Sequence, residues 1–154
     1  MISEPEILET AAVEAAVIPI TCRREDMPKV FGPAVQELFA VLARQGIASE
    51  GAVFAHHLAM PPGMFEFELG VAVAAPVAPE GRVQPGSLPA GRVAHTTYTG
   101  PYEGLYGAWS RFDVWMTANG LQQAGDLWEH YVFGPDKTPD PAEYRTELYR
   151  PLRR

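Results

Sequence analysis

The sequence has little of what a secreted, membrane-spanning or nucleic-acid-binding protein needs. Its 154 residues include a single cysteine, Cys22, so no disulfide can form within the chain and a reducing compartment is favoured. The N-terminus lacks a basic segment followed by an apolar one, so no signal peptide is expected. The longest apolar run, Leu69–Ala75, is far shorter than the roughly 20 residues that span a bilayer. We therefore expect a cytoplasmic protein with no membrane partner.

Positive charge is scarce as well. The formal net charge is −7, and residues 1–80 hold four Lys and Arg against eleven Asp and Glu, whereas residues 81–154 hold eight of each. A stripe of basic residues that could contact phosphates is missing, and Arg150, Arg153 and Arg154 at the C-terminus form the only concentration of cations. The composition therefore predicts a neutral or cationic partner and no nucleic acid.

We expect that the protein does not bind duplex DNA at physiological salt, because the sequence offers no extended cationic surface that could release condensed counterions. A gel-shift assay with micromolar protein checks this expectation. A shifted band that weakens as salt rises would contradict it.

Hydrophobic spacing and turn residues predict an α+β protein with antiparallel sheets and two main helices. The expected elements of the first half are a strand or strand pair over Glu6–Cys22, a helix opened by Gly32-Pro33 and closed by Gly46, and strands Ala52–Met60 and Met64–Ala75. Those of the second half are strand Arg92–Thr99, a helix opened by Gly100-Pro101 and closed by Gly120, and strands Leu127–Phe133 and Tyr144–Leu152. The Pro- and Gly-rich residues 76–91 are expected to be a linker, or a loop with order at its end.

The two halves repeat the same landmarks in the same order. A Gly-Pro pair opens each helix, a glycine closes it, and a Glu-Leu pair lies in the last strand of each half, at Glu68 and at Glu147. This repetition predicts one domain over residues 1–154, made of duplicated β-α-β-β modules (residues 1–78 and 92–154). A pseudo-twofold axis would relate the modules, and a central cleft between them is a natural place for a ligand.

The second half also resembles a known family, the GyrI-like small-molecule-binding domains, which serve as effector-binding domains of bacterial transcription regulators of the AraC and MerR types. The matching segments are Thr99–Leu105, Trp115 with Asn119–Leu121, Trp128–Pro135 and Tyr144–Leu152. The resemblance implies the duplicated fold, a pocket lined with aromatic rings, and an acidic residue in that pocket at the position of Glu147. The family's regulators carry a helix-turn-helix, for which this sequence has no spare residues, so we expect a stand-alone form.

Strand alternation places Arg145, Glu147 and Tyr149 on one face, where a carboxylate beside aromatic rings could neutralise a lipophilic cation. A surface acid paired with Arg145 or Arg150 is the alternative. The candidate ligand-binding residues are Glu147, Tyr131, Tyr149, Trp109, Tyr98 and Glu68.

No metal site or cofactor is predicted. The adjacent His56 and His57 point to opposite faces of a strand, and the chain has neither a phosphate-binding glycine loop nor a nucleophile elbow. The leading hypothesis is a stand-alone protein that senses or sequesters a small hydrophobic compound, neutral or cationic. The alternative is a hydrolase of strained electrophilic compounds that uses Glu147 as base with Tyr131 or Tyr98 as acid. A third is a protein-interaction role like that of a gyrase inhibitor.

Overall fold

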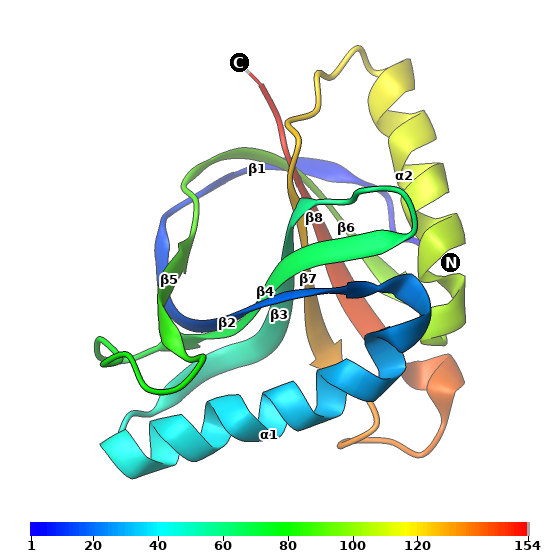
Figure 1. Cartoon of the computed structure of the whole chain (residues 1–154). Helices are drawn as coiled ribbons and strands as arrows, with labels where there is room; N and C mark the ends of the chain where they lie inside the picture. Colours follow the sequence, from blue (N-terminus) through cyan, green and yellow to red (C-terminus); the bar gives the residue numbers. More distant parts are fainter. Residues whose placement is uncertain (154) are drawn as a thin grey trace. The chain divides into compact units, whose positions relative to one another are not determined.

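The computed structural model describes residues 1–153 and divides the chain into two compact units (Figure 1). Residues Ala12–Pro89 form the unit that contains the first helix, called here the α1 unit. Residues Met1–Ala11, together with the chain from Ala90 onward, form the α2 unit. Each unit has a four-stranded antiparallel sheet and one main helix, so the predicted α+β class with two main helices is confirmed.

The α1 unit begins with a long strand and continues through its helix into a hairpin. Its elements are β2 (Val13–Arg23), a 3-10 turn (Arg24–Asp26), α1 (Met27–Gln45), β3 (Ser49–Ala59), β4 (Met64–Val73) and β5 (Gln84–Leu88). The strands lie in the order β3-β4-β2-β5, and every neighbouring pair is antiparallel.

The α2 unit draws one strand from the start of the chain. Its elements are β1 (Glu6–Thr10), β6 (Gly91–Thr99), a 3-10 turn (Tyr102–Gly104), α2 (Leu105–Ala118), β7 (Leu127–Phe133), a 3-10 turn (Pro141–Glu143) and β8 (Arg145–Pro151). The strand order is β1-β6-β8-β7, again antiparallel throughout.

The two units share one order of elements and one pattern of pairing. In each, a strand, a helix and two further strands follow one another, and the last strand pairs with both of the others. A fourth strand then adds to the first, β5 beside β2 and β1 beside β6. Descent of the units from one duplicated module stays a prediction.

The helix ends were predicted better than the helix starts. Gly46 and Gly120 adopt φ values of 67° and 68°, and the amides of Ile47 and Leu121 donate back to Leu42 and Met116, so both helices end in the predicted glycine cap.

The predicted start of α1 at Gly32-Pro33 is wrong. The helix begins at Met27, and Pro33 lies inside it. Pro28 occupies the first turn, where a missing N–H costs nothing, and this proline was the true start signal. In the second half, Gly100-Pro101 precedes a 3-10 turn, and α2 proper begins at Leu105.

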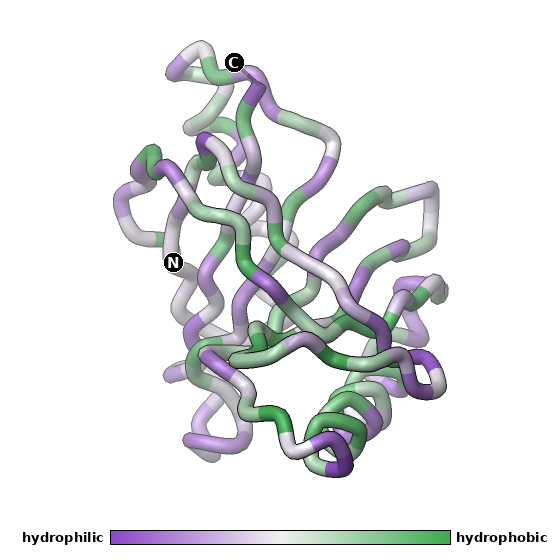
Figure 2. Tube along the Cα trace, turned by 90° about the vertical axis from the view of Figure 1, so that its left-hand side faces the viewer, coloured by the Kyte–Doolittle hydropathy of each residue, from purple (hydrophilic) through white to green (hydrophobic). Residues whose placement is uncertain are grey.

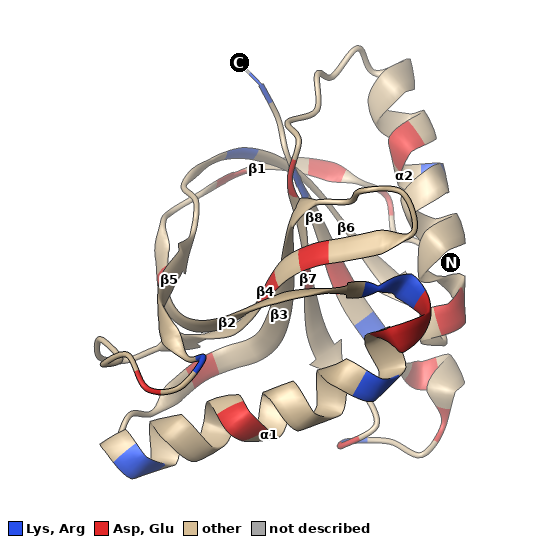
Figure 3. Cartoon of the chain, viewed as in Figure 1, with Lys and Arg blue, Asp and Glu red and all other residues tan. Residues whose placement is uncertain are grey.

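The segment expected to be a linker or a loop, residues 76–91, is held to the α1 unit. The amide side chain of Gln45 exchanges hydrogen bonds with the backbone of Ala78, and Arg44 pairs with Glu80 at 2.6 Å. The same segment then adds β5 to the edge of the sheet, where Pro85 is tolerated because an edge strand has one side free of partners. Glu37 of α1 likewise pairs with Arg82 at 2.8 Å. Figure 3 shows that acidic and basic residues alternate along α1.

The core of the α2 unit lies between α2 and one face of its sheet. Phe112 and Met116 of α2 have no exposed surface, while the partly buried Leu105 and Trp109 pack against this core. From the strands, Ala94, Tyr98 and Leu148 join this core. Figure 2 shows how hydrophobic and hydrophilic residues are interspersed along the trace. Among residues 1–153, no helix is long and apolar enough to cross a membrane.

Candidate functional site

The sheet of the α2 unit has a second face, which strand alternation turns away from α2. On β8, Leu148 packs under α2, so its neighbours Glu147 and Tyr149 lie on the opposite side. We call this side the distal face. The prediction that Glu147 and Tyr149 share a face is confirmed.

Two rows of side chains cross the distal face, because residues directly opposite in a sheet lie on the same side. The strand register gives one row of Thr97, Glu147 and His130, and a second row of His95, Tyr149 and Trp128. In the second row Trp128 stacks on Tyr149 with ring centroids 5.4 Å apart, and the His95 ring lies 4.7 Å from Tyr149. A carboxylate therefore stands next to a stack of aromatic rings.

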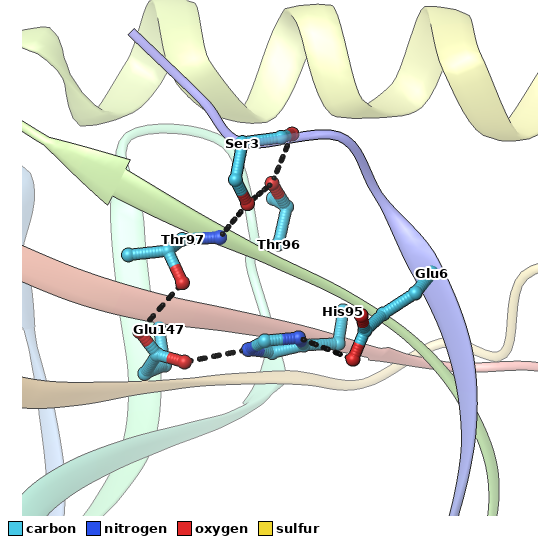
Figure 4. Close-up of polar contacts among 6 residues, drawn as sticks. All are labelled: Ser3, Glu6, His95, Thr96, Thr97 and Glu147. Carbon is cyan, nitrogen blue, oxygen red and sulfur yellow. Dashed lines mark hydrogen bonds and ion pairs between the residues drawn. The ribbon is translucent and has the colours of Figure 1, made fainter.

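Glu147 is half-buried, with 21% of its side chain exposed, and both of its oxygens accept hydrogen bonds (Figure 4). His95 Nε2 lies 2.6 Å from Oε1, and Thr97 Oγ1 donates to Oε2 at 2.7 Å. The hydrogen bond from His95 holds the pKa of Glu147 below its ordinary value, and the bond from Thr97 and the charges of His95 and His130 add to this against the opposing effect of burial. Glu147 is therefore a carboxylate at neutral pH.

The N-terminal segment fixes the position of Thr97 (Figure 4). The backbone amide of Ser3 donates a hydrogen bond to the carbonyl oxygen of Thr97 at 2.9 Å, and the amide of Thr97 donates to Ser3 Oγ at 2.9 Å. Ser3 also accepts a hydrogen bond from Thr96 Oγ1 at its carbonyl oxygen. The hydroxyl that binds Glu147 is thus held by residues from the start of the chain.

The structure separates Tyr98, Tyr131 and Trp109 from Glu147. Tyr98 and Tyr131 both lie opposite Thr146 in the sheet, on the face that α2 covers. Tyr98 is 4% exposed and donates its hydroxyl hydrogen to the carbonyl of Pro101. A base at Glu147 and an acid at Tyr98 or Tyr131 therefore lie on opposite faces of one sheet.

Glu129, which the sequence did not single out, organises Tyr131 and Trp109. It is 7% exposed and accepts hydrogen bonds of 2.7 Å from the Tyr131 hydroxyl and from Trp109 Nε1, so it fastens β7 to α2. Burial raises the pKa of Glu129 against the opposing effect of these two bonds, and burial beside Glu129 raises the pKa of Tyr131 well above its ordinary value. Because residues two apart on a strand share a face, the position of Glu129 two residues before Tyr131 could have indicated this contact.

Glu68, the counterpart of Glu147 in the first half, lies on β4 between His56 and Pro19. It is partly buried, whereas Glu66 on the same strand face is exposed. Because Glu68 belongs to the α1 unit, its role as a second pocket acid stays a prediction.

Three of the residues that surround Glu147 were not predicted from the sequence, namely His95, Thr97 and His130. Their positions depend on the register of β6 and β7 against β8, which alternation within one strand cannot give. Among the described residues, no group of three His, Cys, Asp or Glu side chains is placed to hold a metal ion.

Comparison with known proteins identifies the family. A family model of the GyrI-like small-molecule-binding domain matches residues 3–153, so the chain belongs to this family and the resemblance noted in the sequence is confirmed. A search of curated protein sequences found no match.

Solved structures agree on the fold. The C-terminal domain of EcmrR superposes with a TM-score of 0.86 at 20% identity, covering 98% of each chain. When compared with the whole EcmrR chain in a cryo-EM complex with DNA, the present chain covers 57% of the length of EcmrR.

Two further structures are similar over most of their length. SAV2435 bound to tetraphenylphosphonium has a TM-score of 0.72 at 12% identity, with 98% of this chain and 94% of that chain covered. A hydrolase from Listeria innocua has a TM-score of 0.70 at 14% identity, with 97% and 92% covered. At these identities the likeness establishes the fold.

Proposed function

We propose that this protein binds a small hydrophobic organic cation on the distal face of the α2 unit. Glu147 supplies the negative charge, and the partly exposed ring of Tyr149, which stacks on the buried Trp128, supplies an apolar wall. One observation carries the proposal: an ionised, half-buried carboxylate lies in the row next to a stacked pair of aromatic rings.

The chemistry favours a cation over a neutral or anionic compound. A carboxylate that has lost part of its hydration attracts a positive charge more strongly than one in bulk water. Each aromatic face near the cation adds about 0.5–2 kcal/mol. The likeness to SAV2435, whose structure holds tetraphenylphosphonium, supports a lipophilic cation as the probe.

The binding role is proposed in preference to catalysis. A hydrolase needs an acid and a base that reach the same substrate. Tyr98 and Tyr131 lie on the face opposite Glu147, which argues against the acid–base pairs considered from the sequence. We further propose that the two units are duplicated modules, since they share one order of elements and one pairing pattern. The proposed role of the protein is to sense or to sequester the cation.

Isothermal titration calorimetry with two probes of matched shape and opposite charge tests the function. Tetraphenylphosphonium is expected to bind, whereas tetraphenylborate, with the same four phenyl rings and a negative charge, is expected to bind far more weakly or not at all. Equal affinity for the two ions would indicate a purely hydrophobic site, and tighter binding of the borate would overturn the proposal.

A further inference from the structure

The carboxylate of Glu147 already has a partner that can be a cation. His95 Nε2 lies 2.6 Å from Glu147 Oε1, at the short end of the range for hydrogen bonds between charged groups. Since Glu147 is ionised and can only accept, the hydrogen of this bond must sit on Nε2 of His95. The imidazole is therefore either the neutral Nε2–H form or the doubly protonated cation.

The other ring nitrogen of His95 faces a second carboxylate. Nδ1 is buried, makes no hydrogen bond, and lies 3.6 Å from Glu6 Oε1 on β1 (Figure 4). In the neutral ring this nitrogen would present a lone pair toward a negative charge, which is unfavourable. In the imidazolium it presents an N–H, so each of the two carboxylates that bracket the ring then faces an N–H of the ring.

The remaining neighbours hold the ring in place. His95 lies against Tyr149 of β8, and its side chain is 14% exposed. From β7, a charge on His130 would be attracted by Glu147 and repelled by a charged His95. The titratable groups that face His95 are thus Glu6, Glu147, Tyr149 and His130, of which His130 is the second candidate source of a proton.

We infer that His95 is an internal counter-ion of Glu147, which a cationic ligand replaces by driving its proton off. The inference rests on the proposed function. In the empty site the imidazolium balances the carboxylate. When the ligand brings its own positive charge to Glu147, the Nδ1 proton of His95 passes to the buffer and the ring stays as the neutral Nε2–H donor. The site then has one cation for Glu147 before binding and one after it.

Two consequences follow. Binding of a cation releases a proton, and affinity falls as the pH falls, because histidine changes charge between about pH 5 and 8. The affinity is expected to fall by up to about tenfold for each unit of pH in the acidic range, the limit for one linked proton. His95 therefore tunes the site toward cations in neutral or mildly alkaline solution.

Calorimetry with tetraphenylphosphonium tests this in the wild-type protein, without any substitution. At pH 6.5, titrations in phosphate and in ACES, two buffers of different ionisation enthalpy, should give different apparent heats that correspond to release of a fraction of a proton. The fraction should rise toward one at pH 5.5 and vanish at pH 8.5. Identical heats in the two buffers at every pH, with binding present, would overturn the inference and leave the proposed function standing. Absence of binding in both buffers at pH 8.5 would overturn both.

Two matched variants assign the proton. His95→Gln should bind the probe with no proton release and with an affinity that changes less than about twofold between pH 5.5 and 8.5, while His130→Gln should keep both the release and the pH dependence. The reverse result, with release lost in His130→Gln and kept in His95→Gln, would overturn the role of His95.

Discussion

Replacing Glu147 by glutamine is expected to weaken tetraphenylphosphonium binding by about 1.5–3 kcal/mol, the range for a hydrogen bond or contact that involves a charged group. This corresponds to a loss of affinity of roughly tenfold to somewhat more than a hundredfold. The fold should survive, because glutamine has nearly the same shape, its amide oxygen can accept from His95, and its amide nitrogen can donate to the hydroxyl of Thr97. Calorimetry at pH 8 measures the change.

A matched control is Glu66→Gln, which removes one negative charge from an exposed strand position in the α1 unit. It should leave the dissociation constant unchanged, which separates the local effect of Glu147 from that of net charge. If Glu147→Gln bound the probe as well as the wild type does, the site assignment would be wrong. If it kept binding and lost hydrolysis of a strained electrophile, the hydrolase hypothesis would replace the binding one.

Acid is expected to destabilise the protein through His57. This residue is 5% exposed and packs against the rings of Phe65 and Phe67. Burial, together with the charges of His56 and Arg24, lowers its pKa to about 4. In the unfolded chain His57 has its ordinary pKa of about 6.5 and binds a proton that the folded chain does not bind until the pH is near 4. The contribution of His57 to stability is therefore fully present above pH 6.5 and is lost as the pH drops toward 4. The His57 contribution to this loss is about 3 kcal/mol.

Urea unfolding of the wild type and of His57→Gln at pH 7 and pH 4.5 checks this expectation. Glutamine does not titrate, so the variant should lose less stability than the wild type over the same interval. Comparing the loss of stability between the two pH values in the two proteins removes the effect of the substitution itself. It also removes the effect of Glu147, whose lowered pKa makes acid unfavourable in both proteins. An NMR titration of His57 in the wild type is a second test, and a midpoint near 6.5 or equal losses of stability in the two proteins would contradict the prediction.

More of the fold than of the candidate site could be predicted from the sequence. Glycines 46 and 120 marked the helix ends because a left-handed residue is needed there, and the strand Leu127–Phe133 was predicted with its observed bounds. The start of α1 was misplaced because two prolines competed and the second was chosen. The strand β5 was missed because its Pro and Gly residues are typical of loops, and only pairing with β2 makes them a strand.

In the candidate site too, features that depend on one strand could be predicted and features that depend on strand pairing could not. Alternation within β8 was enough to place Glu147 and Tyr149 on one face, whereas it could not decide on which face Tyr131 lies. Because adjacent residues of a strand point to opposite faces, the pairing of Tyr131 with Thr146 puts it under α2, and the pairing of His130 with Glu147 puts that histidine beside Glu147. A register is set by contacts between strands far apart in the chain, so no single strand reveals it.

The α2 unit is discontinuous in the chain, and this determines the order in which the protein can be built. A ribosome delivers the N-terminus first, so β1 emerges early and must wait, unpaired, for β6. The α1 unit, residues Ala12–Pro89, is contiguous and can fold during that interval. The bonds from Ser3 to Thr97 can form only after β6 has emerged, and the register that sets Thr97 and His95 beside Glu147 only when β8 pairs with it. The proposed binding site is therefore among the last parts of the molecule to be assembled, and a nascent chain stalled before β8 would carry a folded α1 unit without that site.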